Sequence, residues 1–254
     1  MKIIRFSIEK KIKYGTLEGK SVYAIKGNPY RGLQDTDEIY HLDRVKLLAP
    51  SQPSKMVCLG LNYKAHADEA NFAVPKNPLI FLKPPSAIIG PDDDIVYPPM
   101  SQRVDFEGEL GVVIKKKASR ITESNALDYV LGYTCFNDVT ARDLQSADGQ
   151  WTRAKGFDTF AAFGPWIETE LDPENTPVQT YLNGELKQTG NTSQMIFSVK
   201  KVISFISQVM TLLPGDMIAT GTPSGIGPMQ PGDIVEIKIE PIGVLRNRVI
   251  KPSV

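Results

Sequence analysis

The segment RVDFEGELGVVI, residues 103–114, decides how the chain is interpreted. In an extended strand, successive side chains point to opposite faces, so one face of this segment is apolar and the other is acidic. The apolar face carries Phe106, Leu110, Val112 and Ile114, and the acidic face carries Asp105, Glu107 and Glu109. Because carboxylates this close repel one another, a hard divalent cation is a natural occupant between them. The alternative is a solvated outer face of an antiparallel sheet.

The rest of the chain is also rich in short apolar segments that favour strands, such as KMVCLGL, PLIFLK, DMIAT and DIVEIKI. The segment TYLNGELK places Asn-Gly between two strands, as in a type I′ hairpin. Residues 1–50 alternate β-like stretches with turn residues, which predicts a small N-terminal β-module before a larger domain over residues 51–254. A helix is expected over residues 198–213, with Ser198 as its N-cap, and a shorter one over residues 123–131.

Composition limits the possible partners. The chain of 254 residues has 29 Lys+Arg and 29 Asp+Glu, so no excess of one charge favours nucleic acid or an anionic membrane. No apolar run approaches the roughly 18 residues of a membrane-spanning helix. We therefore expect a soluble, cytoplasmic protein that binds a small molecule. Cys58 and Cys135 lack CxxC spacing, and we expect them to be reduced, buried thiols.

Two segments further along the chain combine acidic, basic and amide side chains. If FNDVTARDLQ, residues 136–145, is helical, then Asp138, Arg142 and Gln145 share one helix face. Such a group could hold a metal and a substrate carboxylate, although a surface salt bridge between Asp138 and Arg142 would explain the same spacing. Lys155 follows in WTRAKGF and by itself indicates little.

One of the two histidines has a suggestive neighbour. His66, in GLNYKAHADEAN, precedes Glu69 by three residues, a helical spacing that suits a carboxylate orienting an imidazole for general-base work. An exposed histidine on a polar helix is the alternative, and His41 has no comparable neighbour. The glycine-rich segment ATGTPSGIG, residues 219–227, lacks the Gly-Lys-Ser/Thr of a phosphate-binding loop, but its amides and the Thr222 hydroxyl could bind a carboxylate.

Five of these segments occur in a familiar order: GLNYKAHADE, PLIFLKPPSAIIGP, VDFEGELGVVI, GYTCFNDVTARDLQ with the following RAKGFDTFAAFGP, and IATGTPSGIGPMQPGD. Together they resemble the fumarylacetoacetate hydrolase family from about Lys55 to Ile250. The closest resemblance is to its shorter members, of the acylpyruvase and 2-hydroxyhepta-2,4-diene-1,7-dioate isomerase types. The resemblance implies a β-rich α+β fold, a mixed β-roll or sandwich with peripheral helices, assembled as a homodimer.

The resemblance also implies a role for each candidate residue. The implied ligands of Mg²⁺ or Mn²⁺ are Glu107, Glu109 and Asp138. The implied catalytic residues are Lys155 and a water-activating dyad on a mobile lid, His66 with Glu69. The residues implied to face the substrate are Arg142, Gln145 and Thr222.

An oxygen-loving cation held by three carboxylates suits chelation of a small 2-oxo acid through its carboxylate and 2-oxo oxygen. We expect an enzyme that acts through a metal-bound enolate, with C–C hydrolysis of an acylpyruvate-like or fumarylacetoacetate-like substrate favoured because His66 offers a water activator. Isomerase, tautomerase or oxaloacetate decarboxylase activity would pass through the same enolate. The alternatives from other classes are a non-catalytic structural domain that binds a divalent cation such as Ca²⁺, and a metal-independent binding protein for an organic acid.

Overall fold

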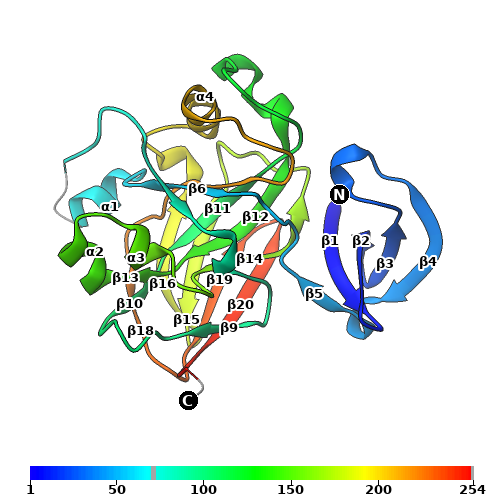
Figure 1. The fold of residues 1–254 in the computed structure, drawn as a ribbon, viewed down its shortest axis with the longest axis horizontal. Helices are drawn as coiled ribbons and strands as arrows, with labels where there is room; N and C mark the ends of the chain where they lie inside the picture. Colours follow the sequence, from blue (N-terminus) through cyan, green and yellow to red (C-terminus); the bar gives the residue numbers. More distant parts are fainter. Residues whose placement is uncertain (70–72, 253–254) are drawn as a thin grey trace.

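The computed structural model describes residues 1–69 and 73–252, which fold into three sheets with helices at their periphery (Figure 1). The β-rich α+β fold expected from the sequence is confirmed. The largest sheet has twelve strands, in the order β4-β3-β2-β1-β14-β12-β11-β17-β6-β7, with β5 on β1 and β8 on β14. Its strands are β1 (Lys2–Ile8), β2 (Lys11–Glu18), β3 (Ser21–Ile25), β4 (Asp35–His41), β5 (Lys46–Leu48), β6 (Met56–Gly60), β7 (Leu79–Lys83), β8 (Ile88–Ile89), β11 (Gly108–Ile114), β12 (Val130–Asp138), β14 (Ala161–Glu168) and β17 (Met217–Ala219).

Two smaller sheets and four α-helices complete the described fold. The three-stranded sheet has the order β13-β10-β18, and the five-stranded sheet has the order β16-β15-β19-β20-β9. Their strands are β9 (Asp94–Val96), β10 (Val104–Phe106), β13 (Thr140–Ala141), β15 (Pro177–Leu182), β16 (Glu185–Asn191), β18 (Gly227–Met229), β19 (Ile234–Ile239) and β20 (Gly243–Ile250). The helices are α1 (Lys64–Glu69), α2 (Arg142–Asp148), α3 (Thr152–Lys155) and α4 (Val199–Val209). No helix in the described ranges has the length and apolar character needed to cross a bilayer.

The main core lies between the largest sheet and the five-stranded sheet. Strands β11 and β12 pack against β15, β19 and β20. Their inward side chains are fully buried, among them Leu110, Cys135, Ile237 and Leu245. Burial of this apolar surface supplies the dominant stabilisation of the fold. Cys58 and Cys135 are both buried and unpaired, as predicted.

The N-terminal strands continue the largest sheet and also enclose a small core of their own. In Figure 1 these blue strands stand beside the rest of the chain, and β1 pairs antiparallel with β14 through Lys2–Glu168 and Ile3–Ile167. Their own buried cluster contains Ile4, Phe6, Leu17, Val22 and Ala24. The division of the chain after residue 50 stays a prediction.

Local expectations from the sequence were met to different degrees. Asn183 and Gly184 between β15 and β16 have φ values of 53° and 80°, as a type I′ hairpin requires. Helix α4 starts after its N-cap Ser198 but ends at Val209, earlier than predicted. The expected helix over residues 123–131 is wrong in type, because residues 123–129 form a 3₁₀ helix and β12 begins at Val130.

Candidate active site

Three buried carboxylates meet where β11 and β12 run antiparallel. Glu107 lies in the break between β10 and β11, Glu109 lies on β11, and Asp138 ends β12. The ladder pairs Gly108 with Asn137 and Glu109 with Phe136, which places Asp138 beside the two glutamates. One oxygen from each carboxylate lies within 4.8 Å of the others. The predicted single strand over residues 103–114 is therefore corrected to two strands of different sheets, but its acidic side chains do converge.

Glu109 has the environment of a cation ligand. Its Oε2 accepts a hydrogen bond from the Gly221 amide at 2.7 Å, while its buried Oε1 has no hydrogen-bond partner among the described residues. Burial raises the pKa of Glu109 well above its usual range, and the charges of Asp138 and Glu107 raise it further. Three hard oxygen donors, one of them without a partner, fit a divalent cation such as Mg²⁺ or Mn²⁺.

Two buried lysines neutralise the carboxylates. The Lys155 Nζ donates to Glu107 Oε2 at 2.9 Å and to Asp138 Oδ2 at 2.7 Å. Burial opposes its positive charge, but Asp138 and Glu107 outweigh burial and raise the pKa of Lys155. Lys83 pairs with Asp138 Oδ1 and donates to the Val139 carbonyl at 3.0 Å, and burial lowers its pKa. Sequence reasoning missed Lys83, although a lysine that ends the apolar strand PLIFLK is an unusual feature.

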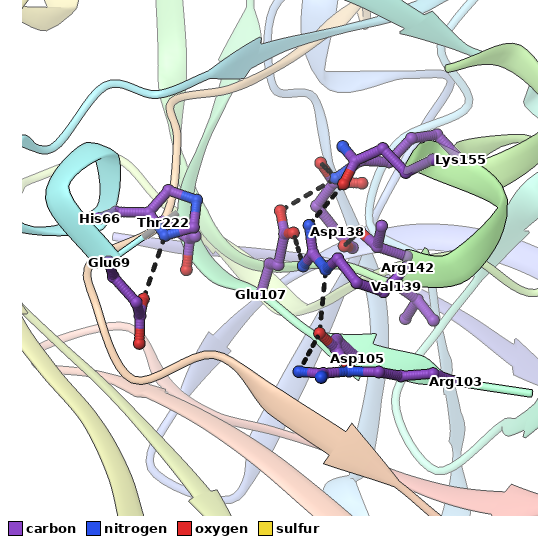
Figure 2. A network of polar contacts seen from close by, with 12 residues as sticks. His66, Glu69, Arg103, Asp105, Glu107, Asp138, Val139, Arg142, Lys155 and Thr222 are labelled. Carbon is purple, nitrogen blue, oxygen red and sulfur yellow. Dashed lines mark hydrogen bonds and ion pairs between the residues drawn. The ribbon is translucent and has the colours of Figure 1, made fainter. Parts of the chain in front are cut away.

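Arg142 is held by three side chains at the start of α2. Its Nε donates to Asp105 Oδ2 at 2.9 Å, its Nη1 donates to Gln145 Oε1 at 2.6 Å, and its Nη2 pairs with Glu107 Oε1 (Figure 2). Asp105 also accepts two hydrogen bonds from Arg103, at 2.9 and 3.2 Å. Burial opposes the charge of Arg142, but Glu107 and Asp105 overcome it and raise its pKa. The fully buried Asp105 therefore fixes the direction of the guanidinium.

The predicted helical face of Asp138, Arg142 and Gln145 is wrong. Asp138 belongs to β12, where the ladder with β14 pairs it with Ala161, and helix α2 begins only at Arg142. The surface salt bridge between Asp138 and Arg142 is not formed either, because Arg142 pairs with Asp105 and Glu107. Arg142 and Gln145 do share one face of α2 and reach the site together.

His66 and Glu69 lie on α1, at another side of the same site. His66 Nδ1 is 3.3 Å from Glu69 Oε2, and both oxygens of Glu69 accept the Gly225 amide, at 3.0 and 3.2 Å. His66 is only 6% exposed, so it is not the solvated histidine of the alternative interpretation. In Figure 2, Glu107 lies between His66 and Lys155. His41 is half exposed and lies at the end of β4, among the N-terminal strands.

Two amides of the glycine-rich segment donate to carboxylates of the protein itself, and the expected binding of a substrate carboxylate stays a prediction. The Gly221 amide donates to Glu109, and the Gly225 amide donates to Glu69. Thr222 Oγ1 donates to the Gly108 carbonyl at 2.9 Å and accepts Gln188 Nε2 at 2.8 Å. Gly108 is required here, because a Cβ at this position would lie 2.1 Å from Thr180 Oγ1.

A cavity joins these groups. Six of the predicted residues line it: His66, Glu107, Arg142, Gln145, Lys155 and Thr222. The other lining residues are Leu59, Gly60, Leu61, Phe81 and Trp151, none of which was singled out from the sequence. Glu109, Asp138 and Glu69 do not line the cavity, which thus combines one carboxylate of the candidate cation site, anion-binding donors and an imidazole with apolar residues, a set of groups that suits chemistry on a small organic acid.

Family models and known proteins are similar to this chain over most of its length. The family model described as fumarylacetoacetate (FAA) hydrolase C-terminal matches residues 55–250, and one described as Rv2993c-like, N-terminal, matches residues 1–50. The mitochondrial oxaloacetate tautomerase Fahd2a of Rattus norvegicus is 44% identical over 82% of this chain and 70% of its own length.

Two solved structures cover the whole chain. The 2-hydroxyhepta-2,4-diene-1,7-dioate isomerase from Mycobacterium marinum has a TM-score of 0.93 and 43% identity, with 100% of both chains covered. The maleylpyruvate hydrolase from Sphingobium sp. SYK-6, solved with manganese(II) and pyruvate, has a TM-score of 0.84 and 30% identity, again with 100% of both chains covered.

Proposed function

Because this chain belongs to the fumarylacetoacetate hydrolase family, a family of enzymes, we propose that it is a divalent-metal-dependent enzyme acting on a small 2-oxo or enol acid. The observation that carries the proposal is the buried group of Glu107, Glu109 and Asp138, with its unpartnered Glu109 oxygen and with Glu107 lining the cavity. When bound there, Mg²⁺ or Mn²⁺ would polarise the 2-oxo group and favour the enolate.

Arg142 is the proposed anchor of the substrate carboxylate. Its guanidinium can grip a carboxylate with two parallel hydrogen bonds, a geometry that lysine does not offer. Asp105 holds Nε from behind, so Nη1 and Nη2 face Gln145 and Glu107 at the edge of the cavity. Gln145 is the proposed second donor to the substrate, and Thr222, which lines the same cavity, is proposed to face the substrate.

His66 is the proposed base. Glu69 lies 3.3 Å from Nδ1, and a carboxylate at that nitrogen fixes the tautomer and leaves Nε2 to accept a proton. For a 2,4-dioxo acid, His66 would take a proton from water as the water oxygen attacks the distal carbonyl. The bond between that carbonyl carbon and C3 then breaks, and protonation of C3 yields a carboxylic acid and a 2-oxo acid. The positive charge of Lys155 would stabilise the oxyanion.

We propose C–C hydrolysis as the reaction, with tautomerisation or isomerisation as the second candidate. The maleylpyruvate hydrolase that was solved with manganese(II) and pyruvate supports the first. The oxaloacetate tautomerase and the dienedioate isomerase support the second, because both reactions need only a base that moves a proton between carbon and oxygen. His66 could serve either reaction.

The test is a Mg²⁺-supplemented panel of acylpyruvates, oxaloacetate and hydroxydienedioates that follows pyruvate release and enol absorbance in parallel. Pyruvate release from acylpyruvates, abolished by EDTA and restored by Mg²⁺, would support hydrolysis. A change in enol absorbance without pyruvate release would support the second candidate. No turnover of any compound would favour the structural cation-binding domain, which does not require His66, Arg142 and Lys155 around a cavity.

A further inference from the structure

Two aromatic rings separate the active-site cavity from a second hollow on the surface. Phe81 on β7 and Trp151, the N-cap of α3, line both spaces. The outer hollow is formed by residues 54–55, 80–85 and 150–152. The other apolar side chains in the cavity lining are Leu59 and Leu61. The partition therefore limits how far an apolar group can extend from the cation site.

The Trp151 ring is held in place by close packing. A Cβ at Gly60, where β6 ends, would lie 2.7 Å from two atoms of the indole, so only glycine leaves room for the ring. The Phe81 ring meets Trp151 edge-on, with centroids 5.2 Å apart and an interplanar angle of 75°. On its other side, Phe81 lies 5.0 Å from Lys155 Nζ. The partition is thus built into the strand and helix that also carry active-site groups.

We propose that Trp151 determines the specificity of the enzyme by restricting the acyl side of the substrate to a short apolar group. The inference rests on the proposed function. A 2-oxo acid anchored at Arg142 and at the carboxylate triad would direct its remaining carbon chain toward the apolar residues. A short chain would contact the indole, and a longer one would need the space that the indole occupies.

A purely structural role for Trp151 makes a different prediction. The Trp151 carbonyl accepts the Lys155 amide at 2.9 Å, so removal of the ring could disturb α3 and with it Lys155. That disturbance would weaken every substrate alike. If Trp151 instead limits the length of the substrate, removal of its ring should change the binding of long 2-oxo acids and leave the binding of short ones unchanged. The dependence of affinity on chain length therefore distinguishes the two roles.

The experiment measures binding of pyruvate, 2-oxobutanoate, 2-oxopentanoate and 2-oxohexanoate to the Mn²⁺-loaded chain by calorimetry. In the parent, affinity should fall by about 10-fold or more for each methylene beyond the longest carbon chain that fits in front of Trp151. In Trp151→Ala, and less completely in Trp151→Leu, this fall in affinity should disappear, because the carbon chain of the acid can then extend into the outer hollow. Trp166→Phe is the matched control. Trp166 lies near the N-terminal strands, under Lys2, so this variant should keep the parent's dependence of affinity on chain length.

The control also supplies a second readout. The chain has two tryptophans, so Trp151 is the single indole of the Trp166→Phe variant, and binding of a 2-oxo acid should change its fluorescence. An unchanged length dependence in both Trp151 variants, or equal weakening of all four acids, would overturn the inference while leaving the proposed function intact. Failure of all four acids to bind the parent would overturn both.

Discussion

Replacing Glu109 with Gln should weaken cation binding strongly without harming the fold. The substitution keeps the shape of the side chain and an oxygen that can accept the Gly221 amide, now 2.7 Å from Oε2. It removes the negative charge of the one triad member whose Oε1 has no partner among the described residues. The metal-free variant should therefore be at least as stable as the parent.

The size of the effect follows from the geometry of the triad. One oxygen of each carboxylate lies within 4.8 Å of the others, and two unit charges at that distance repel by about 3.5 kcal/mol at an effective dielectric constant of about 20. The raised pKa of Glu109 favours its neutral form, which reduces this repulsion in the parent without cation. The gain in metal-free stability should then range from zero to about 3.5 kcal/mol, the repulsion from one neighbouring carboxylate at the outer distance of the triad.

Binding of the cation should make the parent more stable than the variant. At a concentration one hundred times its Kd, Mg²⁺ would stabilise the parent by about 2.7 kcal/mol, or roughly 5–11 °C in Tm for a chain of this size. If loss of the ligand weakens binding about 100-fold, the same concentration would stabilise the variant by only about 0.4 kcal/mol. Thermal unfolding with and without Mg²⁺ measures both values, and Glu185→Gln, an exposed change on β16, is the control. An equal rise in Tm for parent and Glu109→Gln would refute the assignment.

Three further substitutions test other parts of the site. Arg142→Lys should raise KM by about 10- to 100-fold, because lysine loses the two-pronged hydrogen bond; an unchanged KM in steady-state assays would place Arg142 outside the substrate site. His66→Ala should lower acylpyruvate hydrolysis by about 10²- to 10⁴-fold and oxaloacetate decarboxylation far less, and equal losses would mean that His66 does not activate water. Lys83→Met should destabilise the metal-free chain by about 1–3 kcal/mol, because Asp138 Oδ1 and the Val139 carbonyl lose their buried donor while Lys155 still pairs with Asp138 Oδ2. Urea unfolding measures this loss, and an effect as small as that of the exposed Lys46→Met would show that Lys83 contributes little.

Local sequence patterns predicted the acidic side of the site well. Alternation along a strand depends only on the backbone, so the shared direction of Glu107 and Glu109 could be inferred even though the strand breaks at Glu107. The hairpin at Asn183 was predictable for a similar reason, since Asn-Gly tolerates the positive φ values that a type I′ turn needs. The expectation that Asp138 joins the two glutamates came from family resemblance, because the helix face on which the sequence placed Asp138 does not form.

Long-range pairing explains what the sequence did not reveal. The spacing from Asp138 to Arg142 suits a helix, but the ladders with β11 and β14 hold Asp138 in a strand. Lys83 meets Asp138 across 55 positions of sequence, and no local pattern marks such a contact. Trp151 packs closely against Gly60 at the end of β6. The missing side chain of Gly60 is informative only once the two residues are known to be in contact.

The glycine-rich segment between β17 and β18 forms hydrogen bonds with two parts of the site. Its Gly221 amide is bound to Glu109, and four residues later its Gly225 amide is bound to Glu69, the partner of His66. Gly225 has a φ of 98°, and a Cβ there would lie 2.2 Å from the Lys187 carbonyl oxygen, so the segment cannot relax around a larger residue. We expect cation affinity and the orientation of His66 to be coupled through this segment, and such a coupling acts equally in both directions. Protein engineers who substitute residues of this segment should find that the two properties change together.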